Sequence, residues 1–239
     1  NGYSYDGSTT NAVATPTIII GNGGSGTGQR VRNAIVENNI TYACLGSPKD
    51  LTGFIECNCP NMTIRNNIAD MSMGDRTTAY SGPYGYSSVY FATITTSTPD
   101  QTVGVRIYNN TLYTNCASLS HATFVLITSA NAPNPQVDQV TIKNNLWYTP
   151  FYSGPDHMAV RDTSGGATNI VATNNTDTVS GRSVSTAPNF AVHPPVALAD
   201  WRPNTGSYAI DTGATVPVLR DFNMATRAGG TYDMGAVLP

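Results

Sequence analysis

The sequence is short of charged residues, and of glutamate and lysine in particular. Only 11% of its 239 residues are Asp, Glu, Lys or Arg, against about 25% in an average soluble domain. Two residues are Glu and two are Lys. Because surface helices are normally built with these residue types, the composition argues against a helical bundle and against a doubly wound α/β fold. The hydrophobic content of 40% is too high for a disordered chain, and the length suits one all-β unit.

Long apolar runs and dense basic clusters are also missing. No apolar stretch approaches the roughly 18 residues that a membrane-spanning helix needs, so no membrane span is predicted. The formal net charge is −3 and the Lys and Arg residues are scattered along the chain. The sequence therefore predicts no basic patch that would bind nucleic acid. The chain begins at Asn1 without a signal peptide or an initiator Met, which predicts a processed form or a fragment of a longer protein.

Cysteine is scarce as well: the four are Cys44, Cys57, Cys59 and Cys116. The C-x-C pair lacks the C-x₂-C spacing of a zinc site and has no nearby His partners, so no metal ion is predicted. Two alternatives stay open. A disulfide would suit a secreted protein, whereas four small buried thiols would suit a packed core.

Asparagine, in contrast, is abundant and its positions are regular. Ten of the 23 Asn form five adjacent pairs, spaced 28, 43, 35 and 30 residues apart. The pairs are Asn38-Asn39, Asn66-Asn67, Asn109-Asn110, Asn144-Asn145 and Asn174-Asn175. Self-similarity at a period of this size is the signature of a repeat architecture.

The residues before each pair alternate between apolar and mostly polar. The second residue before each pair is Val36, Ile64, Ile107, Ile142 or Ala172, and the fourth is Ala34, Met62, Val105, Val140 or Ile170. This period of two predicts a half-buried β-strand. A second apolar run precedes most pairs, as in the segment 54–57. Each repeat is therefore predicted to be two or three short strands, and the whole to be a solenoid whose coils stack on their neighbours.

The chemistry of asparagine fits the bend of such a coil. A sharp bend needs a residue near the left-handed region, which Asn tolerates better than any residue but Gly. Asparagines stacked at the same point of successive coils can also donate and accept hydrogen bonds along the stack. We therefore predict that the five pairs form a structural ladder.

The unit V-x-I-x-N-N resembles the coil of right-handed parallel β-helix proteins of the pectate-lyase-like superfamily. The C-terminal region is similar to the closing segment of secreted bacterial and viral β-helix proteins in four stretches, namely Asp200-Trp201-Arg202, residues 206–213, Asp221-Phe222 and residues 230–236. The resemblance implies an all-β, single-stranded right-handed parallel β-helix of five to seven coils. The coils would occupy residues 1–186. Residues 187–239 would form a C-terminal cap of the same domain over the open end of the core.

Two groups of residues are candidates for glycan binding. The first lies in the long loop 69–87 and the strand after it: Tyr80, Tyr84, Tyr86 and Tyr90. Their rings could stack on sugars, or they could pin the loop to the coils. The second is a polar column of Arg65, Arg106 and Lys143, with Glu37 beside Arg65. It would suit an acidic polymer, or it could be a solvated surface with an ion pair between coils.

Catalytic residues are harder to assign from the sequence. The candidates are Glu56, Asp75, Arg76 and His121. A lyase needs a positioned base and usually a cation held by clustered carboxylates, so calcium would be expected only for a lyase. A glycosidase needs two carboxylates about 5–9.5 Å apart. The scarcity of acidic residues argues mildly against either enzyme, and no other cofactor is expected.

Three functions follow from these features. The preferred one is an extracellular, cell-surface or virion-appendage module that engages glycans or partner subunits without strong catalysis. The first alternative is a polysaccharide lyase or glycoside hydrolase acting on a polymer in a groove along the coils. The second is a purely structural assembly subunit that contacts copies of itself or a larger parent chain.

Overall fold

The computed structural model describes most of the repeat region and most of the C-terminal segment. The described residues are 18–21, 31–41, 54–72, 75, 77–79, 88–96, 102–117, 121–129, 137–152, 154, 157–163, 165–178, 185, 187–192, 194, 195, 197–218, 220–227 and 232–238.

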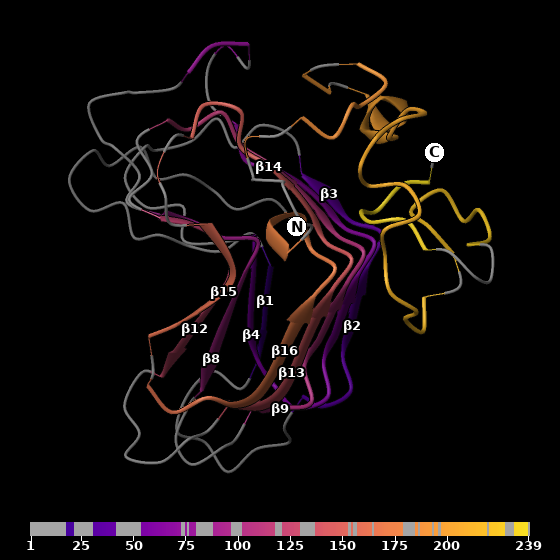
Figure 1. Cartoon of the computed structure of the whole chain (residues 1–239). Helices are drawn as coiled ribbons and strands as arrows, with labels where there is room; N and C mark the ends of the chain where they lie inside the picture. Colours follow the sequence, from indigo (N-terminus) through magenta and orange to yellow (C-terminus); the bar gives the residue numbers. More distant parts are fainter. Residues whose placement is uncertain are drawn as a thin grey trace.

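The strands form three parallel sheets (Figure 1). The first-strand sheet has the order β1 (Ile18–Gly21), β4 (Ile55–Asn58), β8 (Ala92–Thr96), β12 (His121–Ser129) and β15 (His157–Asp162), and β7 (Ser88–Val89) also pairs with β12. The second-strand sheet has the order β2 (Ile35–Glu37), β5 (Thr63–Arg65), β10 (Arg106–Tyr108), β13 (Val137–Lys143) and β16 (Thr168–Thr173), and β9 (Thr102–Val103) also pairs with β13. The third-strand sheet has the order β3 (Ile40–Thr41), β6 (Ile68–Asp70), β11 (Thr111–Tyr113) and β14 (Leu146–Tyr148).

The chain visits these sheets in a fixed rotation. It passes from the first to the second to the third sheet and then starts again, so that each sheet gains one rung per coil. The described part contains five coils, and in the fifth the 3₁₀ turn η1 (Thr176–Thr178) stands where a third strand would follow. This rotation confirms the predicted all-β parallel β-helix. Apart from η1, the only helical turn among the described residues is η2 (Leu198–Trp201).

The paired asparagines lie at the predicted bend. The first Asn of each pair has a left-handed φ, and these are Asn38, Asn66, Asn109, Asn144 and Asn174, with φ between 52° and 59°. A second left-handed position lies five residues earlier in every coil, which the sequence analysis did not identify. It is occupied by Asn33, Asn61, Gly104, Gln139 and Asn169. This second position precedes the strand in β2, β5 and β10, whereas Gln139 and Asn169 lie within β13 and β16.

The second Asn of each pair forms the predicted ladder. The side-chain amide of Asn67 donates to Asn110 Oδ1 at 3.0 Å, and that of Asn110 donates to Asn145 Oδ1 at 3.0 Å. The same contact links Asn39 to Asn67 and Asn145 to Asn175, each at 2.9 Å. Each acceptor also receives the backbone N–H of the preceding ladder residue at 3.0 Å. The buried amides thus satisfy one another along the stack.

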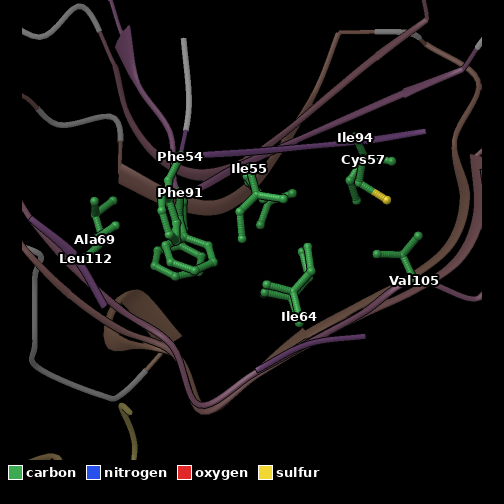
Figure 2. Packing of buried hydrophobic residues seen from close by; sticks show 14 of the residues in the cluster. Phe54, Ile55, Cys57, Ile64, Ala69, Phe91, Ile94, Val105 and Leu112 are labelled. Carbon is green, nitrogen blue, oxygen red and sulfur yellow. The ribbon is translucent and has the colours of Figure 1, made fainter. Parts of the chain in front are cut away.

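The core fills the space between the sheets (Figure 2). Phe91 packs between Phe54, at a centroid distance of 5.6 Å, and Phe124, which is stacked at 4.7 Å with an interplanar angle of 6°. Cys57 and Cys59 lie in the same core. Cys57, Cys59 and Cys116 are buried free thiols, so the structure favours the core alternative over a disulfide for these three. Cys44 lies outside the described residues.

The third-strand sheet is covered on both faces, which explains why every residue of β6, β11 and β14 is buried. Leu112 and Trp147 face the core between the sheets. The other face carries Ile68, Tyr113, Leu146 and Tyr148, which pack against residues of the C-terminal region. The residues of that region that pack against this face include Phe190, Trp201, Tyr208, Met234 and Val237.

We call the described part of residues 187–239 the C-terminal strap. In Figure 1 it lies outside the bend between the second- and third-strand sheets. Its hydrogen bonds run from Asn174 in the fifth coil, through Thr212, to Asn66 in the second coil, through Arg220. The described residues of the strap therefore lie along the flank of the solenoid and bind across its coils.

Candidate functional site

The three cations of the predicted polar column lie on one face of the second-strand sheet. Arg65, Arg106 and Lys143 come from the consecutive strands β5, β10 and β13, which pair in parallel. They alternate with the buried core residues Ile64, Ile107 and Ile142, so all three side chains point outward.

The register divides these cations between two neighbouring columns. Tyr108 stands beside Arg65 on one side and beside Lys143 on the other. Arg106 stands between Thr63 and Thr141, two residues further back along the strands. The prediction of a single column is therefore corrected: the three cations surround Tyr108 on a shared face.

The charges on this face are only partly neutralised. Arg65 Nε lies 2.6 Å from Glu37 Oε2, which is the ion pair between coils that the sequence analysis considered. Arg65 also donates to the carbonyl of Pro217 in the strap. Arg106 is exposed and Lys143 is half-buried, and neither makes an ion pair within the described residues. The other acid on these strands, Asp138, already accepts hydrogen bonds from Thr168 and Asn169.

Tyr108 is a residue of this face that the sequence analysis did not single out. It is 6% exposed and packs with Val216 and Val218 of the strap. Burial raises the pKa of its phenol, although the charge of Arg106 and a hydrogen bond with Thr141 act in the opposite direction. The available signal was its position directly before the third asparagine pair, where the other copies carry Glu37, Arg65, Lys143 and Thr173.

Of the catalytic candidates, Glu56 is the one whose side chain is described on the first-strand sheet. Glu56 points outward, is half-buried, and accepts a hydrogen bond from Thr95 Oγ1 at 3.5 Å. Its column continues through Thr93 and Leu126 to Arg161. Glu56 and Arg161 are thus three strand spacings apart, about 14 Å. His121 begins β12, and its side chain lies outside the described part.

Most of the long loop 69–87 also lies outside the described residues. The predicted site residues Tyr80, Tyr84, Tyr86 and Arg76 fall in that part. Asp75 is exposed and accepts hydrogen bonds from the backbone N–H and the hydroxyl of Thr77, which lower its pKa. Tyr90 is 5% exposed and so offers little area for stacking on a sugar. The described residues therefore leave the second-strand face as the candidate binding surface.

Two further observations bear on the kind of site. Within the described ranges, no group of three or more His, Cys, Asp or Glu is placed to hold a metal ion. The part of the chain that the structure describes also has no helix of the length and apolarity needed to cross a membrane.

Comparison of the chain with protein-family models, with curated proteins and with solved structures finds no match.

Proposed function

We propose that this chain is an extracellular, cell-surface or virion-appendage β-helix module, similar to the pectate-lyase-like superfamily, that binds an acidic glycan without strong catalysis. The single observation that carries the proposal is the outward grouping of Arg65, Arg106 and Lys143 on three consecutive strands. Two of these cations have no ion pair within the described residues, so their charge is available to an anionic ligand.

The geometry of the sheet suits an extended polymer. Neighbouring strands lie about 4.8 Å apart, so a polysaccharide that crosses the strands meets a new coil at a spacing comparable to one sugar residue. The Arg106 guanidinium can hold a carboxylate through two parallel N–H donors, while Lys143 contributes a compact charge one strand away. Exposed charges of this kind are screened by salt, so the proposed binding weakens as the ionic strength rises.

The proposal is tested by titrating the chain with polygalacturonate and with alginate, and with neutral dextran as the uncharged comparison. We expect acidic chains to bind and dextran not to bind. Arg106→Gln combined with Lys143→Gln removes both unpaired cations and weakens binding by roughly tenfold or more, since a hydrogen bond to a charged group contributes about 1.5–3 kcal/mol.

Arg32→Gln combined with Arg202→Gln is the matched control, because it removes the same net charge from two exposed arginines that lie outside β5, β10 and β13. Equal loss of affinity in the control and in the variant of Arg106 and Lys143 would show that only net charge matters and would contradict the site. The same mixtures, followed by absorbance near 235 nm with calcium present, test the lyase alternative: accumulation of unsaturated product would replace the binding proposal with catalysis.

A further inference from the structure

The outward-facing asparagines form a second row, distinct from the buried ladder. This outer asparagine row consists of the first Asn of each pair: Asn38, Asn66, Asn109, Asn144 and Asn174. Every one of them donates its side-chain amide to the strap. Asn174 donates to Thr212 O at 2.9 Å, Asn144 to Ala214 O at 2.7 Å, Asn66 to Arg220 O at 2.7 Å, Asn109 to Asp233 O at 2.8 Å, and Asn38 to Met224 Sδ at 3.7 Å.

In four of these five contacts the asparagine amide donates to a backbone carbonyl of the strap. Asn144 both donates to and accepts from the backbone, because its Oδ1 also accepts the N–H of Ala214 at 2.7 Å. A side-chain amide that donates to a carbonyl and accepts from an N–H imitates the pairing of a neighbouring strand. The solenoid thus holds the strap much as a sheet edge holds an added strand, by hydrogen bonds that any copy of the segment can make.

The surface under the strap cannot remain bare. Tyr113, Leu146 and Tyr148 are at most 5% exposed beneath Phe190 and Trp201. The four rings form a closed circuit, with centroid distances of 5.9 Å for Tyr113–Tyr148, 6.3 Å for Tyr148–Phe190, 5.7 Å for Phe190–Trp201 and 6.1 Å for Tyr113–Trp201. Release of the strap would expose a contiguous aromatic patch, which soluble proteins rarely leave open.

We propose that the outer asparagine row also takes the strap of a second copy of this chain, so that two copies associate by exchanging straps. The identical segment satisfies the same carbonyls and covers the same aromatic patch, whereas an unrelated peptide lacks Phe190 and Trp201. Eight residues, 179–186, separate η1 from the start of the strap, and that length of chain spans up to about 28 Å when extended.

The test mixes tagged and untagged full-length chains at high concentration a few degrees below the unfolding temperature, then cools them. We expect a species of twice the monomer mass by light scattering that contains both forms. Asn144→Gly with Asn174→Gly removes three hydrogen bonds to the strap but keeps a residue that accepts the left-handed φ. This variant opens more easily and is expected to form the mixed dimer roughly tenfold faster.

Asn33→Gly with Asn61→Gly is the matched control, since both residues are left-handed asparagines without a hydrogen bond to the strap. The control is expected to exchange at the rate of the unsubstituted chain. Two outcomes would overturn the proposal: monomers alone at every temperature below unfolding, or equal exchange rates in the two glycine variants. Loss of glycan binding by the Arg106 variant leaves this test unaffected.

Discussion

Asn110 shows how much one ladder asparagine does within the core. Its Oδ1 accepts from the backbone N–H and the side-chain amide of Asn67, both at 3.0 Å. Its own amide donates to Ile64 O at 3.1 Å and to Asn145 Oδ1 at 3.0 Å. The side chain has two donors and two acceptor lone pairs, and every one of them is used inside the protein.

Replacement of Asn110 by Ala is expected to lower the free energy of unfolding by about 3–4 kcal/mol, because buried groups of Asn67, Ile64 and Asn145 lose their partner. Asn39→Ala is the matched comparison. Asn39 stands at the end of the ladder and is half-buried, so its loss costs about 1 kcal/mol. Urea denaturation of both variants measures the difference, and equal costs would contradict a cooperative ladder.

Gly104 is held by two constraints at once. Its φ is +74°, and a Cβ added to it would lie 2.6 Å from Asn61 Oδ1. Gly104→Ala is therefore expected to cost about 2–3 kcal/mol, since backbone strain and a steric clash add. Gly165→Ala separates the two effects, because Gly165 has a φ of +69° and open space around its Cβ. We expect it to cost about 1 kcal/mol, also measured by urea denaturation.

At the scale of the strand, each coil follows a simple local rule. At the second strand of each coil, four residues lie between two left-handed residues, and the later of these is followed by a ladder asparagine. The alternation and the asparagine pairs are local in sequence, so they were enough to predict the strands, the bend and the ladder. The earlier bend could not be predicted as readily, because Asn, Gly and Gln share that position and no pair marks it.

Asp138 ties the last two coils together at that earlier bend. Its Oδ1 accepts from Thr168 Oγ1 at 2.8 Å and from Asn169 Nδ2 at 2.7 Å. These hydrogen bonds lower its pKa below the ordinary value of 3.8. A carboxyl group with a lowered folded pKa stabilises the fold fully above the unfolded pKa and loses that contribution as the pH falls through the folded pKa.

The unsubstituted chain is therefore expected to be more stable than Asp138→Asn near pH 6. The difference between the two should shrink as the pH falls below about 4, the ordinary range of the carboxyl. Urea midpoints of both chains across this range provide the measurement. Carboxyl groups elsewhere titrate in both chains and cancel, so a constant difference would show that Asp138 is not the titrating group.

For the whole molecule, we expect the strap to couple the unfolding of the coils. Coils of a solenoid contact only their neighbours, so their stabilities roughly add. The strap contacts every coil through the outer asparagine row. It is also held by Arg227, which is 5% exposed and donates to Asn66 Oδ1 of the second coil at 3.3 Å and to Gly235 O of the strap at 2.8 Å. Burial lowers the pKa of this guanidinium to about 10, although Asp221 and Asp233 attract its charge, and it stays protonated at neutral pH.

Arg227→Met is expected to detach the strap before the coils unfold, because the methionine can donate neither to Asn66 of the second coil nor to the carbonyls that keep the strap folded. The two tryptophans report the two parts separately, since Trp147 lies in the core between the sheets and Trp201 lies in the strap. Fluorescence of single-tryptophan forms, made by Trp147→Phe or Trp201→Phe, follows each part in urea. Coincident transitions are expected with Arg227 present. Trp201 should respond at lower urea in Arg227→Met.

Arg202→Met is the control for that experiment, because Arg202 is an exposed arginine of the same strap.

The position of the strap along the flank could not be predicted from the sequence. The outer asparagine row binds mainly to backbone carbonyl groups, which every residue has, so no residue type marks the contact. The division of Arg65, Arg106 and Lys143 between two columns also depends on register across coils of unequal length. The sequence shows only the alternation of apolar and polar residues within each strand. That alternation predicts which face of the sheet a side chain lies on, but not which residues of the neighbouring strands lie beside it.

The strap also limits how the number of coils can change. Thr212 and Arg220, eight residues apart in the strap, bind Asn174 and Asn66, which are three coils apart, a rise of about 14 Å. Duplication of one coil between them would add about 4.8 Å to that rise. The carbonyls would then miss their asparagines unless the tail lengthened in the same event. A solenoid of this design can therefore grow or shrink only when two distant parts of its gene change together.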